Sequence, residues 1–329
     1  MTMRQFLGRI RRRHLLRAGT VVILVAVLAG WWAVRTPAPV GYFTSADAQD
    51  RFLRAYERAV DDLPVPDRTL DVRTGYGVVR LYHFAGANPD AAPLLLLPGA
   101  MSASPVWADN LPSLLRLRSV YAVDLLGEPG MSVQQRPIST PRDHAQWLHD
   151  MLLALPEPQV HLVGLSIGGW TAMNLVVHRP DKLASVVLIE PVLVYANLSL
   201  GAIVRSIPAS VRLLPKSFRD DFASWTANDA PVEEVPVAAM IEAGMQTYVN
   251  KKSGPTRLTE KQLAGVRIPT LAILAGESRM HDTDKAAEVA RRAPIGAAVI
   301  VYPDASHAIN GEYPDRITAD IGAFLAGKA

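Results

Sequence analysis

The stretch Val160-His161-Leu162-Val163-Gly164-Leu165-Ser166-Ile167-Gly168-Gly169 decides the fold. An apolar, strand-like run enters it and a helical run leaves it, and the pattern Gly-x-Ser-x-Gly at the junction predicts a very tight strand-to-helix turn. Because Gly164 and Gly168 have no side chains to collide there, the hydroxyl of Ser166 can project above the sheet, towards the helix N-terminus. The alternative is a serine that only caps the helix. The flanking elements favour Ser166 as a nucleophile.

Short apolar runs alternate with helical ones on both sides of this turn. This alternation predicts an α/β fold with a doubly wound, mostly parallel sheet. The inner runs are apolar along their whole length, as expected for strands buried on both faces. The expected strands are Val78–Phe84, Leu94–Leu97, Ser119–Asp124, Val160–Leu165, Ser185–Glu190, Thr270–Ala275 and Ala298–Tyr302. Helices are expected at about residues 141–155, 167–179, 283–292 and 314–326.

One interval breaks the alternation. About 80 residues separate Glu190 from Thr270, far more than one crossover helix needs. Its helical runs and prolines predict a helical cap over the active site. We therefore expect one catalytic domain after a Pro-, Gly- and Thr-rich linker, with the α/β core at residues 46–191 and 268–329, the cap at 192–267 and the linker at 35–45.

The N-terminal segment predicts attachment to a membrane. The first 35 residues hold seven arginines and no acid, and the run Ala18–Val34 is uncharged and apolar. Such a run is long enough to span a bilayer as a helix, and arginines on the cytoplasmic side would leave the catalytic domain outside the cytoplasm. We expect a basic cytoplasmic tail at 1–17 and a single transmembrane helix or signal anchor at 18–34. The alternative is a secreted protein whose signal is cleaved.

Composition narrows the class of function. The chain has no cysteine, which excludes disulfides, thiolate metal sites and a cysteine nucleophile. Its net charge of +3 comes from the arginine-rich tail, so the remainder is mildly acidic and does not favour nucleic acid as a partner. No metal-ligand cluster is visible, and we expect neither a metal nor an organic cofactor. The sequence leaves the oligomeric state open.

These features together resemble the α/β-hydrolase superfamily, from about Ala46 to the C-terminus. Within it the chain is similar to a bacterial carboxylesterase branch. The shared features are a helix with Phe52, Tyr56, Glu57 and Arg58, the run Tyr121-Ala122-Val123-Asp124, the turn at Ser166, the aromatic pair Phe222 and Trp225, and Leu258-Thr259-Glu260. The resemblance implies a serine hydrolase that cleaves a small-molecule ester or acyl substrate through an acyl-enzyme. Lipase, peptidase, acyltransferase or C–C hydrolase chemistry, or a ligand-binding sensor with little turnover, are the alternatives.

The other members of the catalytic machinery are assigned by their place in such a fold. The histidine base follows the last strand, where His307 lies, and His281 is the other candidate. The oxyanion hole needs one amide after the nucleophile and one from the loop after the third strand, which assigns Ile167 and Ala100. Many relatives have His-Gly where this chain has Pro98-Gly99, a change that leaves the amide of Ala100 available.

The sequence does not decide the triad acid. Counting three residues on from the strand-seven glycine, Gly276, reaches Arg279 where relatives have aspartate. Asp282, slightly further along, is the first choice, although it can equally be the N-cap of the next helix. Glu190, at the end of the sixth strand, is the alternative acid, because some haloalkane dehalogenases supply theirs from that position. Two further carboxylates stay open, Glu277 and Asp284.

Overall fold

The computed structural model describes residues 20, 24, 27, 38–292 and 297–327. Two compact units are distinguished, residues 1–39 and Val40–Ala329. The predicted tail and membrane helix lie outside the described residues, except for Thr20, Leu24 and Val27, which are helical and exposed. Among the described residues, none of the helices combines the length and the apolar character that crossing a bilayer requires.

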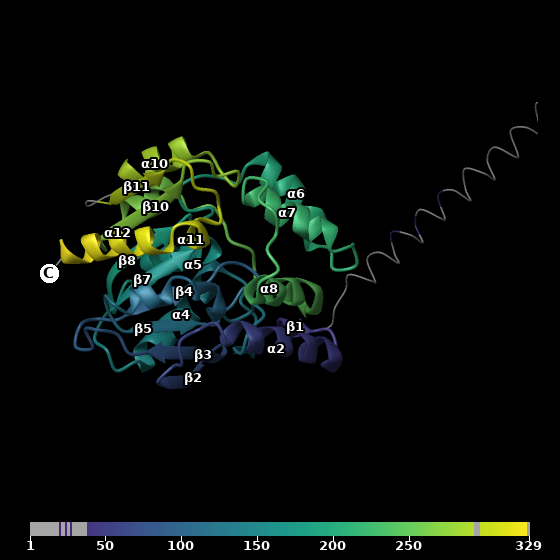
Figure 1. Cartoon of the computed structure of the whole chain (residues 1–329), viewed down its shortest axis with the longest axis horizontal. Helices are drawn as coiled ribbons and strands as arrows, with labels where there is room; N and C mark the ends of the chain where they lie inside the picture. Colours follow the sequence, from purple (N-terminus) through teal and green to yellow (C-terminus); the bar gives the residue numbers. More distant parts are fainter. Residues whose placement is uncertain (1–19, 21–23, 25–26, 28–37, 293–296, 328–329) are drawn as a thin grey trace, which may run out of the picture. The chain divides into compact units, whose positions relative to one another are not determined.

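A nine-stranded sheet forms the centre of the second unit, as far as the chain is described (Figure 1). Its order is β11-β10-β8-β7-β4-β5-β3-β2, and β6 pairs with β3. Strands β5, β4, β7, β8, β10 and β11 are mutually parallel, whereas β3 pairs antiparallel with β2, β5 and β6. The strands are β2 (Arg68–Thr74), β3 (Gly77–Phe84), β4 (Leu94–Leu97), β5 (Val120–Val123), β6 (Val133–Gln134), β7 (Val160–Leu165), β8 (Leu183–Ile189), β10 (Thr270–Ala275) and β11 (Ala298–Tyr302).

The predicted α/β fold with a mostly parallel sheet is confirmed, and each expected strand is present within two residues of its predicted bounds. Strands β2 and β6 were not expected. In β2 only Val72 is buried, while Arg68, Thr69, Asp71 and Arg73 are exposed, so no apolar run marks it. Pairing with β3 along its whole length forms this strand in spite of its polar sequence.

Two hydrophobic cores cover the two faces of the sheet. Strand β4 shows the division, because Leu95 and Leu97 belong to one core and Leu94 and Leu96 to the other, and all four are fully buried. The first core is completed by α4 (Pro141–Ala154), α5 (Ile167–His178) and α10 (Thr283–Arg292). The second is completed by α2 (Ala46–Val60), the 3-10 helix η1 (Ser104–Trp107), α3 (Leu111–Leu114), α11 (Ile309–Glu312) and α12 (Pro314–Ala326).

The interval between β8 and β10 is helical. It contains α6 (Leu200–Ser210), α7 (Ser217–Thr226), α8 (Pro236–Thr247), the short strand β9 (Tyr248–Val249) and α9 (Glu260–Ala264). Strand β9 pairs antiparallel with β1 (Tyr42–Phe43). The ring of Phe43 also contacts Phe52 of α2, with centroids 5.1 Å apart. Tyr42 and Phe43 are therefore part of the folded unit, where the sequence predicts a linker.

Candidate active site

Ser166 lies in a strained turn between β7 and α5. Its φ of 52° and ψ of −113° are unusual for a residue with a side chain. A Cβ atom at Gly164 would lie 2.3 Å from the carbonyl oxygen of Gly168, and one at Gly168 would lie 2.1 Å from the carbonyl oxygen of Leu97. Both contacts are far too short, so the turn requires glycine on each side of Ser166. The two glycines thus allow the serine to stand at the end of β7.

His307 faces this serine. Its Nε2 lies 3.0 Å from the Oγ of Ser166. The loop that carries the histidine runs from β11 to α11 and is fixed on both sides. The backbone N–H of His307 donates to the carbonyl of Thr226 in α7 at 3.1 Å, and that of Ser306 donates to the carboxylate of Glu312 at 2.9 Å. The predicted serine and histidine are therefore brought within hydrogen-bond distance across 141 residues of chain.

Glu190 stands behind His307. Its Oε1 lies 3.4 Å from the Nδ1 of His307, and its Oε2 accepts a hydrogen bond from the amide of Ala275 at 2.8 Å. Burial of this fully enclosed carboxyl raises its pKa, but the contacts with His307, His281 and Ala275 outweigh burial and hold the pKa below its ordinary value. An ionised Glu190 accepts a hydrogen bond from the Nδ1–H of His307, which leaves Nε2 unprotonated and free to take the proton of Ser166.

Asp282, the first choice for the acid, is placed elsewhere. Its Oδ1 accepts the amide of Lys285 at 3.1 Å, its Oδ2 lies 2.7 Å from the Nζ of Lys285, and its side chain is 46% exposed. These are the contacts of a helix N-cap on α10. The geometry therefore corrects Asp282 to Glu190 as the carboxylate at His307. The physical reason is that Asp282 faces the free amides of α10, while the end of β8 faces the histidine loop.

His281 is a buried neighbour of the acid. Its Nε2 lies 3.6 Å from the Oε1 of Glu190, beyond hydrogen-bond distance, and among the described residues neither ring nitrogen has a hydrogen-bond partner. Burial lowers the pKa of His281. It is not the base at Ser166, since His307 occupies that position.

The predicted oxyanion loop passes over the nucleophile. A Cβ atom at Gly99 would lie 3.8 Å from the Cβ of Ser166, which puts the Pro98-Gly99-Ala100 turn beside the serine. Ile167 is the first residue of α5, where an amide has no partner within the helix. Ala100 and Ile167 thus flank Ser166 from two separate elements.

A buried ion pair holds this loop, and the sequence did not predict it. Met101, next to Ala100, has a φ of 54° and donates its amide to the Oε2 of Glu128 at 3.0 Å. The Oε1 of Glu128 lies 2.8 Å from the Nζ of Lys252, and both side chains are at least nine-tenths buried. Lys252 comes from the predicted cap. The sequence around Glu128 contains no basic residue that would indicate an ion pair, so sequence patterns could not predict this contact.

Asp124 organises the neighbouring loops. It ends the β5 run and accepts the amide and hydroxyl of Ser104 at 2.9 and 2.6 Å, the amide of Met131 at 2.8 Å and the hydroxyl of Tyr56 at 2.8 Å. Tyr56 and Asp124 are two of the residues through which the sequence resembles carboxylesterases. Their contact joins α2 to the loops after β4 and β5, so we assign them a structural role.

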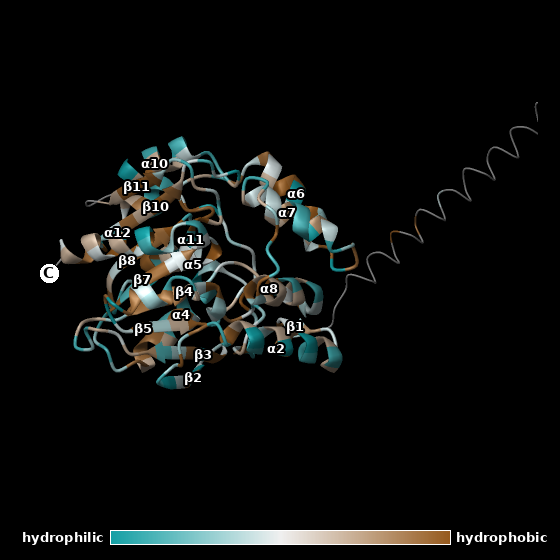
Figure 2. Ribbon diagram, in the orientation of Figure 1, coloured by the Kyte–Doolittle hydropathy of each residue, from teal (hydrophilic) through white to brown (hydrophobic). Residues whose placement is uncertain are grey.

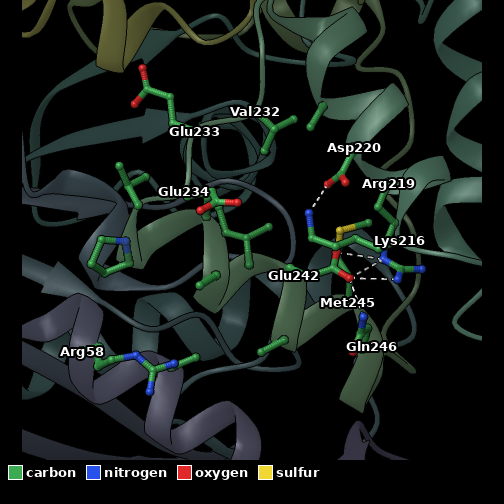
Figure 3. A pocket seen from close by; sticks show the side chains of 18 of the residues that line it. Arg58, Lys216, Arg219, Asp220, Val232, Glu233, Glu234, Glu242, Met245 and Gln246 are labelled. Atoms are coloured by element: carbon green, nitrogen blue, oxygen red, sulfur yellow. Dashed lines mark hydrogen bonds and ion pairs between the residues drawn. The ribbon is translucent and has the colours of Figure 1, made fainter.

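A separate cavity of about 1060 Å³ lies between α2, α7 and α8 (Figure 3). A buried ion pair forms part of its wall, with the Nη2 of Arg219 2.8 Å from the Oε1 of Glu242. Lys216 and Met245 also line it, whereas Ser166, Glu190 and His307 do not. In the described residues, no group of three His, Asp or Glu side chains is placed to hold a metal ion.

Comparison with known proteins places this geometry among hydrolases. A profile of the Alpha/beta hydrolase family matches residues 94–320, which include all three residues of the Ser–His–Glu arrangement. Carboxylesterase YbfK of Bacillus subtilis (strain 168) is 25% identical over 292 residues, covering 87% of this chain and 97% of that protein. Its crystal structure has a TM-score of 0.78 at 22% identity and covers 86% of this chain and 99% of its own.

Two further solved structures share the fold. Naproxen esterase from Bacillus subtilis has a TM-score of 0.78 at 22% identity, covering 85% of this chain and 99% of that chain. A membrane phospholipase A has a TM-score of 0.66 at 22% identity, covering 96% of this chain and 99% of that chain. At these identities the similarity establishes a common fold.

Proposed function

The chain belongs to the alpha/beta hydrolase family, and on that basis we propose that it hydrolyses carboxylic esters with Ser166 as nucleophile. The observation that carries the proposal is the continuous contact from Ser166 through His307 to Glu190, at 3.0 and 3.4 Å. The carboxylesterase relative, which aligns over 87% of the chain, supports an ester as the substrate class.

The proposed reaction uses these groups in turn. His307 takes the proton of the Ser166 hydroxyl as its oxygen attacks the acyl carbon, and the amides of Ile167 and Ala100 hold the resulting oxyanion. The imidazolium, stabilised by Glu190, then gives the proton to the departing alkoxide, and the alcohol leaves an acyl-enzyme behind. Water repeats the attack with His307 as base, which releases the carboxylic acid and restores Ser166.

The test is the loss of turnover in Ser166→Ala. We expect the wild-type chain to hydrolyse p-nitrophenyl esters, with a burst of p-nitrophenol where deacylation is slow, and to be labelled by a fluorophosphonate. The variant should keep its folded circular dichroism spectrum and lose labelling, and its kcat should fall by about 10³-fold or more. A folded wild-type chain that neither turns over esters nor is labelled would contradict the proposal and favour a ligand-binding sensor.

We also propose that residues 18–34 hold the chain in a membrane with the catalytic domain outside the cytoplasm. The support is the sequence, in which an uncharged apolar run follows five arginines. Extraction with alkaline carbonate should leave the protein in the membrane fraction. External protease should reach the catalytic domain in intact spheroplasts, and protection there would contradict the orientation.

A further inference from the structure

Helix α6 turns its large apolar side chains outward. They recur at the spacing i, i+3, i+4 and i+7, which gathers them on one side of a helix. Their exposed fractions are 76% for Leu200, 46% for Ile203, 56% for Val204 and 60% for Ile207. The buried residues of α6 are two alanines, Ala202 and Ala209. Figure 2 shows the hydrophobic colouring on α6 and the loop after it, where Leu213 is 95% exposed.

This arrangement inverts the usual one. A stripe of branched apolar residues at helical spacing normally faces the core, but here the small side chains pack inward. The start of the helix is also fixed, because Ser199 donates its amide to Met280 at 2.8 Å and its hydroxyl to Arg279 at 2.7 Å. The same loop carries His281, next to the acid of the candidate site. The apolar side of α6 is thus presented by a helix anchored at the active-site loops.

The charged side chains of α6 and of the loop after it are all basic, and the exposed carboxylate of Asp229, after α7, interacts with Arg205. No acidic residue occurs between Glu190 and Asp220, while Arg205 and Arg212 are exposed on or directly after α6. The guanidinium of Arg205 lies 5.4 Å from the ring centre of Trp225. An apolar stripe bordered by cations is typical of helices that lie in the plane of a bilayer surface containing anionic lipid.

We propose that the α6 face, defined as Leu200, Ile203, Val204 and Ile207 with Arg205 and Arg212, docks on the surface of a phospholipid bilayer that contains anionic lipid. A second copy of the chain would bury the same apolar side chains, but it would bring the arginines of both copies into one interface. An anionic headgroup layer instead pairs with both features of the face. The proposal is independent of ester hydrolysis and of the segment at 18–34.

The absence of cysteine allows a direct test. Ile207→Cys in the full chain is labelled with the environment-sensitive dye NBD, and Leu153→Cys on α4, 56% exposed, is the matched control. Each protein is reconstituted in phosphatidylcholine nanodiscs with and without phosphatidylglycerol. Doxyl-labelled lipid should quench position 207 about twofold more than position 153, with blue-shifted emission at 207. Phosphatidylglycerol should strengthen this difference, and Arg205→Glu with Arg212→Glu should reduce it.

Two results would overturn the proposal. Equal quenching of both positions by aqueous iodide, without doxyl quenching at 207, would show that the α6 face stays in water. Protection of position 207 from both quenchers would show that protein covers the face, as in a dimer. Neither readout depends on turnover, so a failure of the esterase proposal would leave this test intact.

Discussion

Glu190 is an ionised carboxylate with no exposure to water. Burial alone would favour its neutral form, and the amide of Ala275 together with two histidines reverses that preference. The catalytic partner that we assign to this buried carboxylate is the Nδ1 of His307. Whether the acid comes from the end of β8 or from the loop after β10 makes no difference to its task, which is to fix the tautomer and stabilise the imidazolium.

Replacing this carboxylate should therefore separate the two candidate acids. Glu190→Gln keeps the shape but removes the charge and offers an amide donor to Nδ1, which favours the wrong tautomer of His307. We expect kcat for p-nitrophenyl acetate to fall by about 10³- to 10⁴-fold. The matched variant Asp282→Asn, which affects only the cap of α10, should change kcat by less than about twofold. The reverse order of effects would return the acid to Asp282.

The sequence predicted Ser166 and His307 because each is marked locally, one by its glycines and one by its place after the last strand. It could not choose the acid. An aspartate before a helix is the same pattern whether it caps that helix or reaches a histidine, and only the packing of the strand ends separates the two. The ion pair of Glu128 and Lys252 was missed because the two residues are 124 positions apart in the sequence.

At the scale of elements, the segment predicted as a cap contacts the predicted oxyanion loop. Helix α8 lies close to that loop, because a Cβ atom at Gly244 would be 2.8 Å from Pro129 and 3.4 Å from the carbonyl oxygen of Met101. Lys252, just after β9, completes the contact through Glu128. The ion pair therefore couples a cap segment to the amide next to Ala100. We infer that Glu128 is a positioning residue for the predicted oxyanion hole.

Glu128→Ala should loosen that hole. The amide of Met101 loses its acceptor and Lys252 is left as an unpaired, largely buried cation, so we expect kcat to fall by about 10- to 100-fold. A trifluoromethyl ketone, which mimics the tetrahedral intermediate, should bind more weakly by a similar factor, while KM changes by less than about threefold. Lys285→Met, which breaks an exposed ion pair, is the control. If the role of Glu128 is purely structural, Glu128→Ala will lower thermal stability but leave the affinity for the trifluoromethyl ketone unchanged.

Strands and helices were predicted wherever burial is two-sided, as in β4, whose four leucines are all fully buried. The prediction failed where strand pairing, and not burial, forms the element. Strand β1 pairs with β9, some 200 positions away, and the polar strand β2 pairs with β3, which follows it directly. In α6 the helical period was readable, but the period does not say which side faces out, so the exposed stripe needed the structure.

At the scale of the whole molecule, buried histidines connect stability to pH. His144 of α4 and His161 of β7 are both enclosed, and each has its pKa lowered to about 4, by burial first and then by the cations Lys252 and Arg118, respectively. His144 also donates from Nε2 to the carbonyl of Ser253 at 3.0 Å and lies edge-on to Trp170. Neutral His144 thus links α4 and α5 to the segment after β9.

Acidification should therefore unfold the protein in part through His144. Between pH about 6.5 and about 4 the unfolded chain binds a proton at this site that the folded chain does not, so stability is complete above the unfolded pKa and is lost as pH falls towards the folded pKa. From pH 7.5 to pH 5 this site should remove about 2 kcal/mol from the free energy of unfolding. Urea titrations at both pH values should show a smaller loss for His144→Gln than for the wild-type chain. Equal losses in the two proteins would mean that His144 titrates alike in the folded and unfolded chains, and that its neutral contact with Ser253 does not resist protonation.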